Sequence, residues 1–268
     1  LSGELALQIP LDVVGNPGGI GGISVLSYAR RRLPGADYLY YADTDHVPYG
    51  TKSRGEIIRY SDEAVGFLAE QGADAVVVAC NTATSMAIGY LREKYPFPIV
   101  GMEPAVKPAA AAHQGEKILV CATPVTIAGE KLHTLIEHNY ASDDLPDLIG
   151  LPGLVTFAEQ EIFDRGDVCK YLASVIDKER NYSAVVLGCT HFGYFSDSFR
   201  ELLGDIDLID GTKGTVNRLI SVLESEGIGL PADGEGSMTF FRTGRPVTEP
   251  ETLAFYGRLL ARAEKFQN

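Results

Sequence analysis

The chain carries two matching segments whose cysteines lie 109 positions apart, and this internal repeat constrains the fold most. Residues 74–82 read DAVVVACNT and residues 183–191 read SAVVLGCTH, so each apolar run ends at a cysteine, Cys80 or Cys189. Short, wholly apolar runs are typical of strands buried on both faces of a parallel sheet. The repeat therefore predicts two related units, each with a cysteine at the carboxyl end of a strand.

Apolar strand-like runs alternate with helix-like stretches along the whole chain. Strands are expected at 38–41, 75–79, 98–100, 117–120 and 184–187, and helices at 24–32, 56–70 and 216–226. This alternation predicts an α/β fold made of two pseudo-symmetric lobes, each an open parallel sheet. We expect a discontinuous first lobe, residues 1–104 plus 213–268, and a second lobe at 105–212.

Composition excludes several classes of function. The 268 residues carry a formal net charge of −13, which disfavours binding to nucleic acid. The basic run at 30–32 suits a helix C-terminus and needs no phosphate partner. No window is apolar enough for a membrane span, and residues 1–10 lack the basic start of a signal peptide. A cytoplasmic protein without membrane or nucleic-acid partners is expected.

The other motifs that suggest chemistry are weak. The four cysteines form no CxxC pair, so zinc and redox motifs have no support, and Cys121 and Cys169 are interpreted as structural. The glycines at 15–22 do not match a dinucleotide or Walker pattern. His46, next to the VPYG block, is interpreted as a surface residue, with a place in a cleft as the alternative. Glu103 fits a capping role and a cleft role equally well.

The paired cysteines fit one kind of reaction. Ligands of open α/β sheets bind beyond the carboxyl ends of the strands, where Cys80 and Cys189 are expected. Inverting a carbon that bears hydrogen requires a base on one face and an acid on the other, and two thiols in a cleft between the lobes would supply both. Expected helix starts after both cysteines would stabilise a thiolate and bind a carboxylate.

Three blocks, in order and well spaced, carry a family resemblance: VPYGTKS (47–53), ACNTA (79–83) and LGCTH (187–191). With shorter matches at 19–22, 43–44, 103–104, 122–126 and 210–211, the chain resembles the glutamate racemase family. These are the cofactor-independent amino-acid racemases of bacterial cell-wall synthesis, within the aspartate/glutamate racemase superfamily. The resemblance implies a site between two lobes, a glutamate-like substrate, a homodimer, and neither cofactor nor metal.

The resemblance also assigns residues. It implies deprotonation by Cys80 and Cys189 from opposite faces, with His191 beside the second cysteine. The implied substrate-binding residues are Pro48, Tyr49, Gly50, Asn81, Thr82, Thr123, Thr126, Glu159 and Thr190. Glu161 is an alternative to Glu159 as the acidic residue of the second lobe.

The chain departs from the family at its first motif. Where the family has Asp-Ser-Gly, this sequence has Pro17, Gly18 and Gly19, so no side chain there can take a proton. The usual Tyr-Pro after the GCTH block is replaced by Phe192-Gly193. The main expectation is a glutamate racemase. The alternatives are a racemase for another acidic amino acid such as aspartate, and an impaired homologue that binds a small ligand or regulates.

Overall fold

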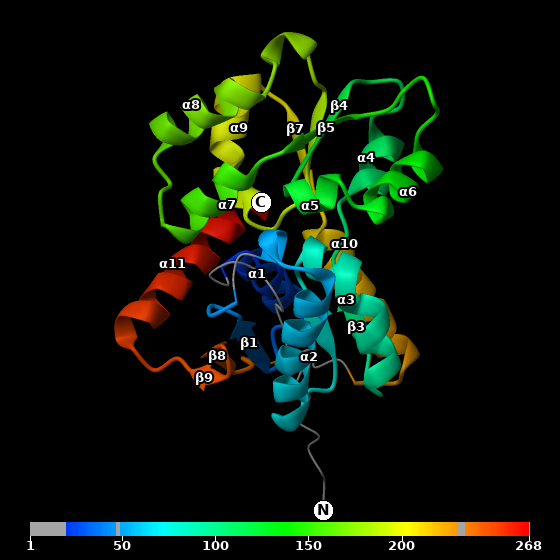
Figure 1. The fold of residues 1–268 in the computed structure, drawn as a ribbon. Coiled ribbons are helices and arrows are strands. Elements are labelled where there is room, and N and C mark those ends of the chain that lie inside the picture. Colours follow the sequence, from blue (N-terminus) through cyan, green and yellow to red (C-terminus); the bar gives the residue numbers. More distant parts are fainter. Residues whose placement is uncertain (1–19, 47–48, 230–233, 268) are drawn as a thin grey trace, which may run out of the picture. The chain divides into compact units, whose positions relative to one another are not determined.

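The computed structural model describes residues 20–46, 49–229 and 234–267. Pro17, Gly18 and Pro48 lie outside them. The chain divides into two compact units, one of residues 1–102 and 212–268 and the other of residues 103–211. Figure 1 follows the chain from blue to red and shows the last helices, in orange and red, beside the blue α1 of the first unit.

The described residues of the first unit form two small sheets. β1 (Tyr38–Ala42) pairs in parallel with β8 (Met238–Arg242), which pairs antiparallel with β9 (Arg245–Pro246). β2 (Val76–Val78) pairs in parallel with β3 (Ile99–Gly101). The helices of this unit are α1 (Ile23–Arg32), η2 (Tyr49–Thr51), α2 (Arg54–Glu70), α3 (Asn81–Lys94), α10 (Thr212–Ser225) and α11 (Pro250–Gln267).

Local sequence signals account for the ends of α2. Ser53 and Glu56 form a capping box, in which each side chain accepts a hydrogen bond from the other residue's backbone. The helix therefore begins at Arg54, two residues before the predicted start. Gly72 follows its end with a φ of 89°, a conformation that costs other residues energy. The buried face of α2 packs on α3 and on the strand residues Val76 and Val78.

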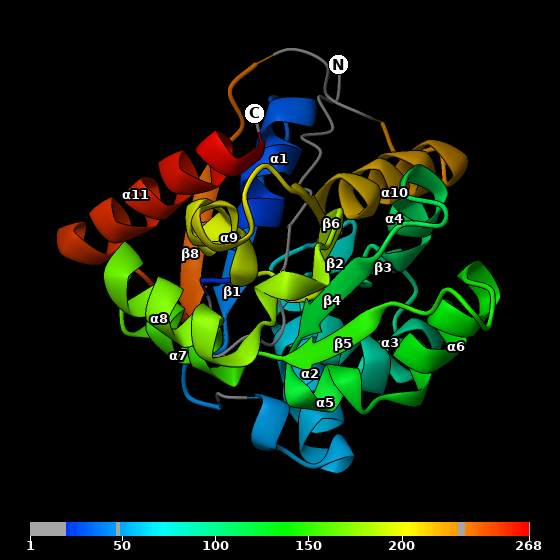
Figure 2. The same cartoon turned by 90° about the horizontal axis from the view of Figure 1, so that it is seen from above.

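The second unit is built on one four-stranded parallel sheet with the order β5-β4-β6-β7. Its strands are β4 (Ile118–Ala122), β5 (Asp147–Gly150), β6 (Ala184–Leu187) and β7 (Asp207–Asp210). Its helices are α4 (Val106–Ala112), α5 (Pro124–Ile127), α6 (Glu130–Asn139), α7 (Pro152–Glu159), α8 (Arg165–Val175), η3 (Lys178–Arg180), η4 (Phe192–Phe195) and α9 (Ser196–Leu203). Figure 2 shows β4, β5 and β6 next to one another.

The central strands of the second unit are the most apolar. Every residue of β4 and β6 is buried, whereas β5 and β7 at the edges are half-buried or exposed. This is the burial that the wholly apolar runs at 117–120 and 184–187 indicate. The predicted α/β fold with parallel sheets is confirmed.

Two absences concern the described residues only. Across residues 20–46, 49–229 and 234–267, no helix is long and apolar enough to cross a membrane. Within the same stretches, histidine, cysteine and acidic side chains form no group of three or more that could hold a metal ion.

Candidate active site

The first predicted cysteine lies between a buried strand and a helix. Cys80 is the N-cap residue of α3, and its sulfur accepts a hydrogen bond from the backbone N–H of Ala83 at 3.4 Å. Asn81 and Thr82 are buried in the first turn of the same helix. The partial positive charge at a helix N-terminus stabilises a thiolate. The predicted helix start after Cys80 is confirmed.

Tyr49 and Gly50 lie in the short helix η2, which packs against α3. The Tyr49 ring belongs to the same buried apolar cluster as Cys80. Its hydroxyl donates a hydrogen bond of 2.6 Å to Oδ2 of Asp43, a carboxylate only 1% exposed. Burial, and secondly the charge of Asp43, raise the pKa of Tyr49, so its hydroxyl stays protonated and acts as a donor.

The second cysteine is joined to two ionisable side chains. The sulfur of Cys189 lies 3.5 Å from Nδ1 of His191, and Nε2 of His191 lies 2.5 Å from Oε1 of Glu159. His191 is fully buried. Burial alone would lower its pKa, but the hydrogen bonds with Cys189 and Glu159 outweigh burial and raise the pKa of His191 to about 10. A protonated imidazole therefore lies beside the thiol.

The same geometry separates the two acidic candidates. Glu159 is the last residue of α7 and reaches His191, whereas Glu161 lies beyond the helix end with a φ of 58°. A left-handed backbone of this kind commonly follows a helix end. The structure thus places Glu159 rather than Glu161 in the Cys189–His191 chain.

The backbone after Cys189 differs from the prediction. Instead of an α-helix, the 3-10 helix η4 follows, and the regular helix α9 begins only at Ser196. The bulky side chains of η4, including Phe192 and Tyr194, are all buried. A helix does start after Thr190-His191 as expected, but it is a short 3-10 helix with His191 as its N-cap, and the ionisable group beside the Cys189 sulfur is His191.

The other predicted residues of the second unit lie at the adjacent strand end. Thr123 follows β4 and caps α5, where its hydroxyl oxygen accepts a hydrogen bond from the N–H of Thr126 at 3.3 Å. β4 neighbours β6 in parallel, so Thr123 and Cys189 follow the same edge of the sheet. A Cβ on Gly188 would come within 2.9 Å of the Cys121 carbonyl oxygen, which explains the glycine before Cys189. Thr190 is buried.

Several residues lie outside this arrangement. Cys121 is buried in β4, and the Cys169 sulfur contacts the Ser198 carbonyl oxygen at 3.8 Å. Glu103 is exposed and forms an ion pair of 2.6 Å with Lys131. His46, by contrast, stacks on Tyr60 with ring centroids 3.8 Å apart, and its Nδ1 lies 2.7 Å from Oδ1 of Asp43, the carboxylate that also binds the Tyr49 hydroxyl.

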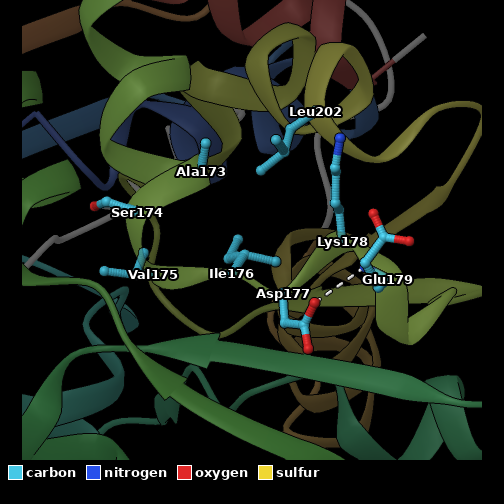
Figure 3. A pocket seen from close by; sticks show the side chains of 8 residues that line it. All are labelled: Ala173, Ser174, Val175, Ile176, Asp177, Lys178, Glu179 and Leu202. Atoms are coloured by element: carbon cyan, nitrogen blue, oxygen red, sulfur yellow. Dashed lines mark hydrogen bonds between the residues drawn. The ribbon is translucent and has the colours of Figure 1, made fainter.

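One cavity of the second unit contains none of the predicted site residues. It has a volume of about 470 Å³ and lies at the end of α8, as Figure 3 shows. Its lining residues are Ala173, Ser174, Val175, Ile176, Asp177, Lys178, Glu179 and Leu202. An apolar patch beside a few exposed charges gives no convergent polar groups for a ligand.

Asp43 contacts a predicted site residue, although sequence reasoning assigned it no role. It follows β1 directly, six positions before Tyr49. A strand followed by an acidic residue is a weak signal, because it equally describes an exposed turn. In the structure, β8 from the far end of the chain pairs with β1, and Thr243, which follows β8, contacts the buried Asp43.

The chain belongs to the Asp/Glu/hydantoin racemase family, whose pattern matches residues 24–219. It is 50% identical over 230 residues to a glutamate racemase of Halothermothrix orenii, which covers 85% of this chain and 90% of that protein. It is 49% identical to a glutamate racemase of Campylobacter curvus, with 92% and 95% covered. A crystal structure of Escherichia coli glutamate racemase with L-glutamate and the activator UDP-MurNAc-Ala superposes with a TM-score of 0.77, at 28% identity, over 92% of this chain and 95% of that one.

Proposed function

We propose that this protein is a cofactor-independent glutamate racemase that interconverts L- and D-glutamate with two cysteines. The observation that carries the proposal is the pair of buried strand-end cysteines, Cys80 and Cys189, each held by a specific hydrogen-bonding group. The bacterial relatives of about 50% identity bear the name glutamate racemase, which supports glutamate as the substrate.

The proposed reaction moves one proton off the α-carbon and another on. The thiolate of one cysteine takes the α-proton, and the C–H electron pair stays on the substrate as a carbanion. The thiol of the other cysteine then donates its proton to the opposite face, which inverts the carbon. The first cysteine ends as a thiol and the second as a thiolate, so the next turnover runs in the reverse sense unless the protons return through solvent.

The neighbours of Cys189 suit this exchange. A protonated His191, 3.5 Å from the sulfur, stabilises the thiolate form of Cys189. Glu159 holds the other ring nitrogen and so fixes the imidazole orientation. At Cys80, the N-terminus of α3 plays the corresponding part.

The substrate contacts in the proposal are those that the family resemblance assigns. Pro48, Tyr49, Gly50, Asn81 and Thr82 would serve the first half. Thr123, Thr126 and Thr190, together with Glu159, would serve the second. Hydroxyl and amide groups of this kind can hold the carboxylates and the ammonium group of glutamate.

The wider setting is also part of the proposal. The enzyme would work in the cytoplasm and supply D-glutamate for peptidoglycan synthesis. It would act as a homodimer, with the amino acid as its only other partner. Light scattering at assay concentration tests the dimer, and a monomer of full activity would contradict it.

A second candidate rests on Pro17 and Gly18, which replace two polar residues of the family. An impaired homologue would bind glutamate without turnover, and a changed specificity would favour aspartate. The test is incubation of L-glutamate or L-aspartate with the protein in D₂O, followed by NMR of the α-hydrogen. We expect exchange and racemisation of glutamate. Exchange of aspartate alone would identify aspartate as the substrate. Exchange of neither amino acid would favour a protein that only binds its ligand.

A further inference from the structure

The segment at 42–45 is held by a hairpin from the far end of the chain. The Thr243 hydroxyl oxygen accepts the backbone N–H of Asp45 at 3.1 Å and lies 3.3 Å from the Thr44 hydroxyl. The same hydroxyl donates to Oδ1 of Asp43 at 3.5 Å. One guanidinium nitrogen of Arg245, Nη2, donates to both carboxylate oxygens of Asp45, at 2.7 and 2.8 Å. The β8–β9 hairpin thus fixes the chain just before Tyr49.

Asp43 links this hairpin to the candidate site. Its carboxylate is 1% exposed and lies within hydrogen-bond distance of the Tyr49 hydroxyl, the His46 ring and the Thr243 hydroxyl. A buried carboxylate is tolerated only when its oxygens are bonded, so these groups stabilise a single position of the side chain. Tyr49 in turn belongs to the helix η2 that packs on α3, the helix capped by Cys80.

The backbone of Thr243 gives an independent reason to look for a role. Thr243 has a φ of 44° and Gly244 a φ of 76°, as in a tight hairpin that favours Asn-Gly. A β-branched residue is unfavourable in this region, and such strain is often found where a side chain serves function. Asparagine or glycine would suit the turn better, but neither offers a hydroxyl.

We propose that Asp43, held by Thr243, is a positioning residue that orients Tyr49 and Gly50 for binding the substrate. This inference rests on the proposed function, because it assigns Asp43 to the substrate segment of that same site. Asp43 acts through the Tyr49 hydroxyl and not on the reacting atoms. Its loss therefore weakens substrate binding more than it slows proton transfer.

The first test is the steady-state kinetics of Asp43→Asn with glutamate. Loss of a charged hydrogen-bond acceptor predicts a rise in KM of about tenfold, with kcat changed less than about threefold. If the wild-type protein racemises glutamate and Asp43→Asn leaves KM unchanged, the inference is overturned while the proposed function stands. If the wild type neither exchanges nor racemises glutamate, the proposed function fails first.

The second test distinguishes the effect of the Thr243 hydroxyl on KM from any effect of the substitution on the stability of the turn. Thr243→Gly removes the hydroxyl and suits the positive φ, so we expect thermal stability to be kept and KM to rise. Thr243→Ser retains the hydroxyl and should keep a KM near the wild-type value. The matched control is Ser237→Ala, which removes a hydroxyl bonded to Asp37 at 2.6 Å, just before β8 begins. Equal KM values for Thr243→Gly and Thr243→Ser would overturn the inference, whether or not Asp43→Asn folds.

The third test asks whether Asp43 acts through Tyr49. Tyr49→Phe removes the hydroxyl that donates a hydrogen bond to the Asp43 carboxylate. The double variant Tyr49→Phe/Asp43→Asn should therefore raise KM no more than the single variant with the larger effect. Additive effects of the two substitutions would show separate roles and contradict the inference.

Discussion

Cys80 and Cys189 follow equivalent strands of the repeat, but their surroundings differ. The contacts of Cys80 include a helix N-terminus and an apolar cluster that contains Tyr49. Cys189 instead lies beside the buried, protonated imidazole of His191, which Glu159 holds. The same strand and cysteine thus recur in both units, but a thiolate would be stabilised by backbone dipoles at Cys80 and by the ionisable pair of His191 and Glu159 at Cys189.

The difference suggests how each thiol responds to change. A helix dipole is a fixed property of the backbone and depends little on pH. An imidazole–carboxylate pair changes charge with pH and can be altered by one substitution. We therefore expect the Cys189 side to be the more sensitive to pH and to single mutations of its neighbours.

The largest expected effect is a loss of racemisation activity, and it should be the same for substitution of either cysteine. Cys80→Ser and Cys189→Ser each remove the acid or base of one face, so racemisation should fall by at least about a thousandfold. A coupled assay for D-glutamate measures the loss. Cys169→Ser, which alters a thiol outside the site, is the control and should stay active. Full activity in either active-site variant would end the two-thiol account.

The next effect concerns the Cys189 side alone. Glu159→Gln keeps the shape of the side chain but removes the charge that helps to raise the pKa of His191. We expect kcat to fall by roughly ten- to a hundredfold, because less imidazolium then faces the thiol. Glu161→Gln is the matched control and should change kcat little. A larger loss in Glu161→Gln than in Glu159→Gln would reverse the assignment.

The same pair predicts a dependence of stability on pH. The pKa of His191 is raised from an ordinary value near 6.5 to about 10, so its protonated form favours the folded state. This stabilisation is complete below about pH 6.5, declines as pH rises, and is lost above about pH 10. The Tm difference between wild type and Glu159→Gln should therefore be larger at pH 6.5 than at pH 10. Thermal unfolding at both pH values checks this, and equal differences would contradict it.

A smaller effect concerns the first unit. Restoring the family's polar pair with Pro17→Asp and Gly18→Ser should raise kcat by about tenfold, the size expected for one added hydrogen bond. The enantiomers are equally stable, so kcat/KM is the same in both directions, and a difference between the directions can appear only in the separate kcat values. The unfolding curve establishes that the variant folds. A folded variant no faster than the wild type would show that the aspartate is dispensable here.

The smallest effect is on stability. Serine is a preferred N-cap residue, so Cys80→Ser should strengthen the start of α3 by about 0.5 kcal/mol and raise Tm by about 1–2 °C. Cys189 precedes a 3-10 helix and caps no α-helix, so Cys189→Ser should bring no gain. Differential scanning calorimetry of the two inactive variants makes the comparison, and equal Tm shifts would mean that the two surroundings are equivalent.

The sequence predicts those parts that depend on short-range patterns. Wholly apolar runs marked β4 and β6, and the alternation of runs and helices indicated the α/β fold. The repeat marked both cysteines, because a strand, a cysteine and small polar residues recur at one offset. Patterns of this kind depend on neighbours along the chain, which a sequence displays directly.

The rest depends on contacts between distant segments. Nothing local distinguishes Glu159 from Glu161, and only the end of α7 decides which one reaches His191. The local sequence likewise did not indicate that the helix after Cys189 is a 3-10 helix whose residues are all buried. Asp43 has local partners in His46 and Tyr49, but its third partner, Thr243, lies 200 positions further on, just after β8, the strand that pairs with β1.

Two different groups are proposed to act on opposite faces of glutamate, and early-time isotope incorporation in D₂O distinguishes this mechanism from one with a single group. With L-glutamate as substrate, NMR and chiral separation follow deuterium in both enantiomers before equilibrium. The account predicts that the first D-glutamate carries deuterium at the α-carbon while the remaining L-glutamate stays protiated, since the proton taken by one thiol is not returned to the same face. Early D-glutamate that retains the original hydrogen would show that a single group serves both faces, and would contradict the account.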